Sequence, residues 1–279
     1  SASGYPGWLE NHIPGSLHAD LLNDLADSEA SFSFALPPTA ALTNALAALG
    51  VSERRRVVIY DRADGFWAAR LWWMLRGIGI QAAVLDGGFK AWESNTVADQ
   101  PLDSRLRGGP PMRNDGVIPA ATVVPAQAGT QWSGNPGQAD ANPSWVNRAQ
   151  VEAIVAGQAE GILICALGSA LFDGTAPTRY ARRGHIPGSL NLPARTLFDA
   201  QGRYLPKDAL AAVFEGAFGP ELLNSDTPLI LYCGGGISAA ANALALTLLG
   251  RQHVAIYDGS LQEWAADPAL PMTTGAPPA

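Results

Sequence analysis

The sequence predicts an α/β protein made of two tandem copies of one fold, each a mostly parallel sheet with helices on both faces. Two observations support this prediction. Four short blocks recur in the same order at one spacing, and within each copy short apolar runs alternate with helical patterns. The length of 279 residues and the hydrophobic content of 47% are sufficient for two cores.

The repeat is defined by four pairs of positions. HIPGS begins at His12 and again at His185, which lies 173 positions later. The other pairs are each separated by 172 positions, and they are Asp61 with Cys233, Asp86 with Asp258, and Trp92 with Trp264. Such regular spacing indicates a duplicated domain. We therefore expect an N-terminal domain over residues 1–98 and a C-terminal domain over residues 144–279.

The segment between the two copies, residues 99–143, has the composition of a linker. It holds 6 Gly and 7 Pro and shows no sustained helical or strand period. The first copy begins too late to include a counterpart of the apolar run around Cys165. We therefore expect the N-terminal domain to lack its first strand.

The apolar runs place the elements of each copy in order. The N-terminal copy predicts a helix from about Pro38 to Gly50, a strand over 57–61, a helix over 66–77 and a strand over 82–86. The C-terminal copy predicts a strand over 162–167, a helix from Pro206 to about Gly219, a strand over 228–233, a helix over 238–249 and a strand over 253–258. Continuous apolar strands are typical of a sheet covered on both faces.

The main chemical signal is Cys233, which ends an apolar strand and is followed by three glycines and a helix. Ligand sites of parallel sheets lie at the carboxyl ends of strands. Glycines can curl tightly and direct their N–H groups at one point, and a helix N-terminus adds unpaired donors. These donors stabilise a thiolate, a persulfide or another anion. We therefore predict Cys233 as the nucleophile, in a cradle formed by Gly234, Gly235, Gly236, Ile237 and Ser238.

Several other residues are candidates for a functional role. The N-terminal copy has Asp61 at the cysteine position, in an acidic turn that we expect to repel anions, so this copy is predicted to be catalytically silent. Cys165 lies inside an apolar run, where a small buried hydrophobe is expected. Arg179 and Arg183 precede His185 and are candidates for binding an anionic substrate. The HIPGS histidines occur in both copies, which favours a structural role.

Composition excludes several classes of function. Lys+Arg 18 against Asp+Glu 25 gives a net charge of -7, without a long basic run, so we expect no nucleic-acid partner. No apolar stretch is long enough to span a bilayer, and we expect no membrane partner. The four histidines and two cysteines fit neither a zinc motif nor a disulfide framework. We expect no metal or organic cofactor, and a cytoplasmic location.

These blocks together resemble the rhodanese family, specifically its tandem-domain thiosulfate and 3-mercaptopyruvate sulfurtransferases. The resemblance rests on GHIPGS, the cysteine loop, YDGSLQEW and a first copy with Asp at the cysteine position. It implies that Cys233 takes a sulfane sulfur from a small anionic donor as a persulfide. It also implies an acceptor such as cyanide, a thiol or a protein. The six-residue loop from Cys233 to Ser238 has the length that the family uses for sulfur transfer.

The chain departs from the family pattern at four places. The family usually has Asp-Ala-Arg where this chain has residues 165–167, and Leu171 replaces the first of two carboxylate-binding arginines, while Arg179 fits the second. Gly235 replaces a loop serine of the mercaptopyruvate enzymes, and the loop carries no basic residue. Either donor, thiosulfate or 3-mercaptopyruvate, therefore remains open.

Two alternatives to a sulfurtransferase are considered. The lost acidic and basic residues favour a degenerate module that binds a partner or carries sulfur without turnover. A cysteine phosphatase or arsenate reductase would need an arginine six positions after the cysteine to clamp the oxyanion. Ala239 occupies that position, which argues against the second alternative.

Overall fold

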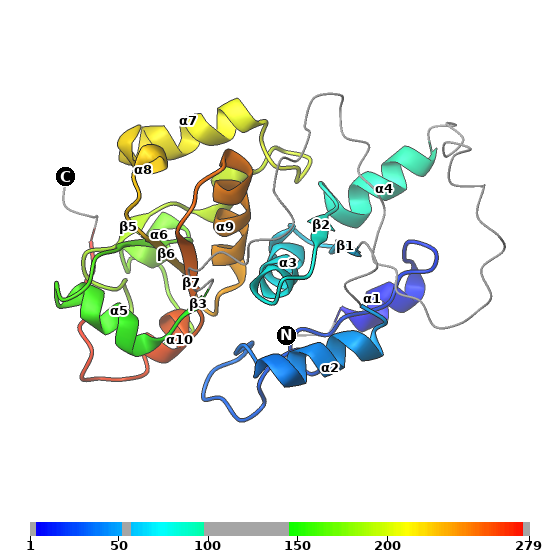
Figure 1. Ribbon diagram of the computed structural model, residues 1–279. Coiled ribbons are helices and arrows are strands. Elements are labelled where there is room, and N and C mark those ends of the chain that lie inside the picture. Colours follow the sequence, from blue (N-terminus) through cyan, green and yellow to red (C-terminus); the bar gives the residue numbers. More distant parts are fainter. Residues whose placement is uncertain (1–3, 52–56, 98–144, 276–279) are drawn as a thin grey trace.

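The structure is a computed structural model that describes residues 4–51, 57–97 and 145–275. The predicted linker over 99–143 lies outside the described residues. Figure 1 shows the two copies packed against each other, with α3 of the N-terminal copy beside α9 of the C-terminal copy. Within the described ranges, none of the helices combines the length and the apolar character that a membrane crossing requires.

Most predicted elements are present in both copies. The N-terminal copy contains α1 (Tyr5–Glu10), α2 (Thr39–Ala48), β1 (Val57–Ile59), α3 (Phe66–Gly77), β2 (Ala82–Val84) and α4 (Gly88–Val97). The strands of the C-terminal copy are β3 (Trp145–Val146), β4 (Ile162–Cys165), β5 (Leu190–Asn191), β6 (Leu229–Tyr232) and β7 (Val254–Tyr257). Its helices are α5 (Arg148–Val155), α6 (Ser169–Phe172), α7 (Lys207–Phe218), α8 (Glu221–Asn224), α9 (Ile237–Leu249) and α10 (Ser260–Trp264), with a 3₁₀ helix over Ala194–Leu197.

The C-terminal sheet has the strand order β3-β7-β6-β4-β5, and every pair is parallel. Successive side chains of a strand point to opposite faces. Leu229, Leu231 and Cys233 accordingly belong to the core on the side of α7 and α9. Ile230 and Tyr232 belong to the core on the side of α5, α6 and α10. The predicted parallel sheet with helices on both faces is confirmed.

The N-terminal sheet is smaller in the described part of the chain. It consists of β1 and β2, which pair in parallel from Val57 with Ala82 to Ile59 with Val84. One face shares the core with α3 and α9, and the other packs in a separate cluster that includes Val58 and Phe89.

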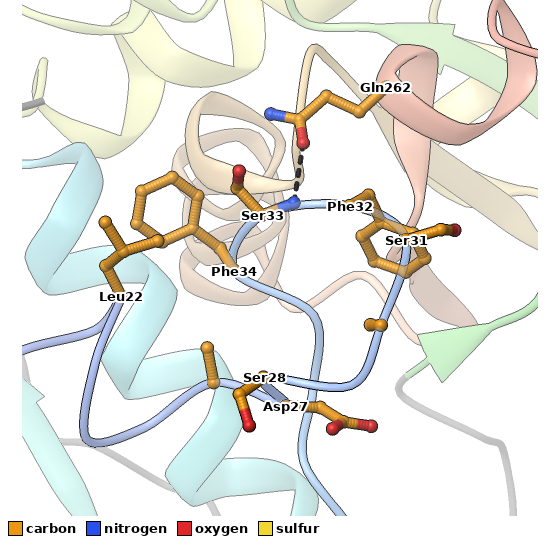
Figure 2. A pocket seen from close by; sticks show the side chains of 10 residues that line it. Leu22, Asp27, Ser28, Ser31, Phe32, Ser33, Phe34 and Gln262 are labelled. Carbon is orange, nitrogen blue, oxygen red and sulfur yellow. Dashed lines mark hydrogen bonds between the residues drawn. The ribbon is translucent and has the colours of Figure 1, made fainter.

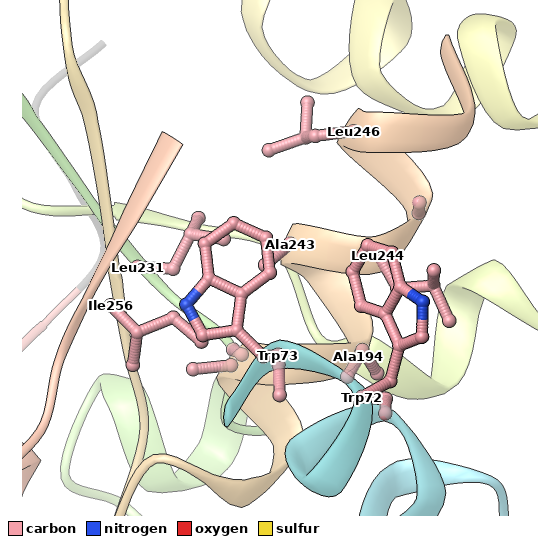
Figure 3. Packing of buried hydrophobic residues seen from close by; sticks show 14 of the residues in the cluster. Trp72, Trp73, Ala194, Leu231, Ala243, Leu244, Leu246 and Ile256 are labelled. Atoms are coloured by element: carbon pink, nitrogen blue, oxygen red, sulfur yellow. The ribbon is translucent and has the colours of Figure 1, made fainter. Parts of the chain in front are cut away.

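The two copies share one hydrophobic core (Figure 3). Trp73 of α3 is 1% exposed and lies among Leu231, Ala243 and Ile256 of the C-terminal copy. The residues of α9 from Ala239 to Leu246 are all buried, and five of these are alanines. Small side chains let two helices approach closely, and a fully buried large apolar side chain stabilises the fold by about 1.5–3 kcal/mol. The interface therefore holds the copies together as a core does.

The two HIPGS turns are anchored in the same way. In the N-terminal copy, the Tyr60 hydroxyl accepts a hydrogen bond from the Ile13 N–H at 3.3 Å and bonds the Ser16 hydroxyl at 2.7 Å. In the C-terminal copy, the Tyr232 hydroxyl accepts from the Ile186 N–H at 3.1 Å and donates to the Ser189 hydroxyl at 2.9 Å. Each tyrosine comes directly before the aspartate or cysteine of its copy, so each turn is fixed to the end of that strand.

The histidines of these turns also play matching parts. The ring of His12 donates to the Trp8 carbonyl at 2.8 Å and stacks on the Trp8 ring. The ring of His185 donates to the Phe172 carbonyl at 2.8 Å and stacks on the Phe172 ring. Burial lowers the pKa of His185, which favours the neutral ring. These shared contacts support a structural role.

Candidate active site

Cys233 lies at the carboxyl end of β6 and is 2% exposed. The start of α10 holds its backbone on both sides. The Cys233 N–H donates to the Ser260 hydroxyl at 3.2 Å, and the Cys233 carbonyl accepts from the Leu261 N–H at 3.1 Å. The Gly234 carbonyl accepts from the Gln262 N–H at 2.9 Å. The YDGSLQEW block therefore fixes the position of the cysteine.

Each glycine of the cysteine loop, residues 233–238, is covered by a different side chain. The Tyr180 hydroxyl lies where a β-carbon on Gly234 would project. A β-carbon on Gly235 would lie 2.9 Å from Nε2 of Gln262, and one on Gly236 would lie 2.5 Å from Nη1 of Arg70. Any larger residue would displace one of these three neighbours. Close packing therefore explains why glycines fill the loop.

The loop ends at a helix N-terminus, as predicted. Gly236 is the N-cap of α9 and has a left-handed conformation with φ 75° and ψ 2°. No hydrogen bond joins the N–H groups of Gly234, Gly235 or Gly236 to another described residue. Ile237 and Ser238 form the first turn of α9 and are half-buried. The N–H groups of the three glycines directly follow Cys233 in the chain, and their role as an anion cradle stays a prediction.

The corresponding turn of the N-terminal copy holds an acidic side chain. The Asp61 carboxylate accepts hydrogen bonds from the N–H groups of Ala63 at 2.9 Å, Gly65 at 3.1 Å and Ala68 at 3.0 Å. Gly65 is the N-cap of α3, with φ 82° and ψ -8°, and matches Gly236. The expectation that this turn repels other anions stays a prediction, and it fits the observation that the side chain of Asp61 occupies the backbone donors.

Tyr180 is a site residue that sequence reasoning missed. Burial raises the pKa of its hydroxyl, the negative charge of the Cys233 thiolate raises that pKa further, and the charge of Arg179 opposes both. The Arg179 guanidinium carbon lies 5.6 Å from the centre of the Tyr180 ring. Arg179 is itself exposed. The structure therefore places Arg179 near the ring of Tyr180, and its role in binding substrate stays a prediction.

The neighbouring arginines lie in different surroundings. Arg182 donates hydrogen bonds of 2.6–3.0 Å to the carbonyls of Trp264, Ala265, Asp267 and Leu270. It therefore clamps the segment after α10. Arg183 is exposed and packs its β-carbon near Gly174. No contact given for the described residues joins Arg183 to the cysteine loop, and its role in binding substrate stays a prediction.

Cys165 is separated from the cysteine loop by the sheet. Its partner across β4 and β6 is Tyr232, so Cys165 and Cys233 point to opposite faces. Cys165 is completely buried, and burial raises its pKa to about 12. A thiol with that pKa stays protonated near neutral pH and is a poor nucleophile.

A second residue that sequence reasoning missed is Arg70, on α3 of the N-terminal copy. It is 1% exposed and forms an ion pair with Asp258 at 2.7 Å. The available signal was a single arginine inside the apolar run FWAARLWWML, because a charge at a buried helix position needs a partner. Its partner could not be read from the sequence.

A cavity of about 310 Å³ lies beside the cysteine loop, between residues 22–34 and α10 (Figure 2). Gln262 forms part of its wall and accepts a hydrogen bond from the Ser33 N–H at 2.8 Å. Asp27 is the charged residue among those that line it. Among the residues with described positions, no group of three His, Cys, Asp or Glu side chains is arranged to hold a metal ion.

Comparisons with known proteins identify the family of this chain. The rhodanese-like domain model matches residues 3–95 and 156–267. Thiosulfate/3-mercaptopyruvate sulfurtransferase 2 of Arabidopsis thaliana is 35% identical, over 94% of this chain and 74% of its own length. The 3-mercaptopyruvate sulfurtransferase of Escherichia coli K12 is 30% identical over 95% and 84%. Thiosulfate sulfurtransferase of Gallus gallus is 30% identical over 91% and 78%.

Solved structures agree on the fold. A structure of EanB with hercynine superposes with a TM-score of 0.72 at 21% identity. The match covers 98% of this chain, which spans 62% of the length of that one. Two family matches within one chain, together with relatives of 30–35% identity along nearly all of it, settle the family. The chain belongs to the rhodanese family of sulfurtransferases, as a protein with two rhodanese-like domains in tandem.

Proposed function

We propose that this protein transfers a sulfane sulfur from thiosulfate or 3-mercaptopyruvate, through a persulfide on Cys233, to a thiophilic acceptor such as cyanide or a thiol. The N-terminal copy carries no nucleophile in this proposal. The relatives named above act on one or both of these donors according to their names.

The observation that carries the proposal is the hydrogen bonding of Asp61. Its carboxylate marks where the turn after this strand binds negative charge, with three backbone donors at 2.9–3.1 Å. Counted from the two N-cap glycines, the counterparts of Gly65 and Ala68 are Gly236 and Ala239. We expect the backbone donors around Cys233 to bind the anionic part of the donor and the persulfide in the same way.

The reaction proceeds in two displacements. The Cys233 thiolate attacks the outer sulfur of thiosulfate, the bond between the two sulfur atoms breaks, and sulfite leaves with the bonding electron pair. Cyanide then attacks the terminal sulfur of the persulfide, thiocyanate is released and the Cys233 thiolate is restored. Storing the sulfur covalently divides one transfer into two easier steps and gives ping-pong kinetics.

Arg179 is proposed to bind the anionic part of the donor. This role is supported by its position over the ring of Tyr180, whose hydroxyl covers Gly234. Charge-assisted hydrogen bonds contribute about 1.5–3 kcal/mol, so R179M should raise the half-saturating concentration of thiosulfate about tenfold or more. R183M is the matched control for losing one exposed charge, and a larger effect in R183M would reverse the two assignments.

The decisive experiment is a test for the persulfide. The full chain is incubated with thiosulfate or 3-mercaptopyruvate, sulfur addition is mapped by peptide mass spectrometry, and cyanide is added to release thiocyanate. C233S should lose at least about 10³-fold in turnover because the nucleophile is gone. C165S should keep at least partial activity.

The outcomes separate the alternatives. Equal loss in C233S and C165S would contradict the assigned roles of the two thiols. A persulfide that forms but is not released by cyanide or thiols would favour a sulfur-carrying module. Absence of a persulfide with either donor would refute the proposal, and convergent lines in initial-rate plots would refute the two-step scheme.

A further inference from the structure

We propose that Arg70, supplied by the N-terminal copy, is a positioning residue of the cysteine loop. The N-terminal copy would then complete the active site of its twin, although it carries no nucleophile itself. This inference goes beyond the proposed function and rests on it for one of the two measurements below.

Arg70 is buried at the junction of both copies. Nη2 donates to the Phe34 carbonyl at 2.6 Å and to the Asp258 carboxylate at 2.7 Å. The guanidinium carbon lies 4.3 Å from the centre of the Trp145 ring, which is a cation–π distance. One side chain of α3 thus joins the 31–36 segment of its own copy to β3 and to the end of β7 in the other copy.

The same guanidinium touches the cysteine loop. Nη1 lies 2.5 Å from the place that a β-carbon on Gly236 would take. Neither Nε nor Nη1 of Arg70 has a hydrogen-bond partner among the described residues. Arg70 is 1% exposed, and two of its three side-chain nitrogen atoms are unpaired. Burying a charge in this way costs free energy, so a contribution to stability does not by itself explain why an arginine lies here.

Arg70 also acts on the cysteine through Asp258. This aspartate accepts a second hydrogen bond, from the Leu36 N–H at 2.7 Å. Two positions later, the Ser260 hydroxyl accepts the hydrogen bond from the Cys233 N–H and donates to the Tyr257 carbonyl at 2.9 Å. Fixing Asp258 therefore fixes the turn that grips the cysteine backbone. The loop is held from Gly236 on one side and from Ser260 on the other.

The arginine breaks an otherwise repeated arrangement. Asp86, the counterpart of Asp258, accepts a hydrogen bond across the interface from the Tyr204 N–H at 2.8 Å, as Asp258 does from Leu36. Arg70 is the fifth residue after the N-cap Gly65, and the fifth residue after the N-cap Gly236 is Ala241. The turn of the N-terminal copy also has an arginine of the other copy beside it, because Arg195 pairs with Asp64 at 2.9 Å. Arg195 is exposed, whereas Arg70 is buried and lies against the N-cap glycine of the cysteine turn.

The test uses full-length R70M and R70K, with R76M as the control. Arg76 lies on the same helix and contacts the rings of Trp72 and Trp73. Quenched-flow reactions with thiosulfate give the rate constant and the amplitude of persulfide formation. Hydrogen–deuterium exchange measures the exchange rates of the backbone amides of the cysteine loop. Because a shift of about 1 Å in a reacting group can cost on the order of 10²-fold in rate, R70M should slow persulfide formation to that extent at unchanged half-saturation. Its loop amides should exchange faster, R70K should recover part of both properties, and R76M should match the natural chain.

Each other outcome has a clear meaning. If R70M lowers only the amplitude, in proportion to a smaller folded fraction, Arg70 is merely structural and the proposal fails. It also fails if R70M changes neither the rate constant nor the exchange of the loop. If the natural chain forms no persulfide but the loop amides still exchange faster in R70M, the sulfur-transfer proposal fails while the positioning role of Arg70 stands.

Discussion

The turns after β1 and β6 share one scaffold and differ in what they place at its centre. In both, a tyrosine anchors the HIPGS turn, a left-handed glycine caps the following helix, and the central carbonyl accepts from the next helix. That carbonyl bond is 2.9 Å from Phe89 to Asp61 and 3.1 Å from Leu261 to Cys233. In one turn the carboxyl group of Asp61 accepts from the backbone donors, and in the other Cys233 takes the place of the aspartate.

In the proposed function, the shared scaffold binds negative charge in both turns, and the residue at its centre decides whether that charge can react. A carboxylate in the cradle is a permanent internal ligand. A thiolate at the same place is also a nucleophile. Three predictions test how far the two turns are equivalent.

The largest effect is expected when the carboxylate of the first turn is placed in the second. C233D should fold, because Asp61 shows that such a turn accepts a carboxylate. It should lose at least about 10³-fold in sulfur transfer because it has no thiol. Circular dichroism and the thiocyanate assay check the two statements. Unfolding of C233D would show that the turns are not equivalent.

The next effect is expected in the N-terminal copy. D61A leaves the N–H groups of Ala63, Gly65 and Ala68 without their acceptor and should lower the free energy of unfolding by about 2 kcal/mol. Burial raises the pKa of Asp61, so the folded state binds its proton more tightly than the unfolded state. The contribution of Asp61 is then largest below its ordinary pKa and shrinks as pH rises through the raised value.

The stability gap between the natural chain and D61A should therefore be larger at pH 4 than at pH 7. Urea titrations at the two pH values measure it, and D61N serves as the control that keeps one acceptor. A gap that grows toward pH 7 would contradict the stated direction of the pKa shift.

The smallest effect is a difference between the two N-cap glycines. Both G65A and G236A place a side chain at positive φ, which costs roughly 1–2 kcal/mol. In G65A the new methyl meets only the rim of the Phe198 ring, at 3.3 Å, whereas in G236A it displaces Arg70. G236A should therefore lose about 1 kcal/mol more in urea unfolding. G236A should also slow persulfide formation more than G65A does. If the two variants lost the same stability and the same rate of persulfide formation, the result would count against a role for the Arg70 contact.

Much of the fold followed from local signals. The run FWAARLWWMLRG gave α3 with its observed ends, and α9 begins one residue before the predicted Ser238 because Gly236 caps it. Short elements such as α6 and β5 carry too few residues for a periodic pattern, and they form where neighbouring segments pack.

The candidate site divides in the same way. Cys233 and its glycines were visible because strand, turn and helix follow one another along the chain. The residues that cover those glycines come from elsewhere: Arg70 meets an aspartate 188 positions away, and Tyr180 reaches the loop from 53 positions before Cys233. One sequence does not reveal such pairings, because they depend on how the two copies dock.

The register of β4 against β6 has a consequence under oxidative stress. The chain has two cysteines, and the pairing of Cys165 with Tyr232 directs the two sulfur atoms to opposite sides of the sheet. An internal disulfide between them would require the backbone to move. If peroxide converts Cys233 to its sulfenic acid, recovery must come from a thiol on another molecule. Such recovery links this enzyme to the reducing capacity of its surroundings.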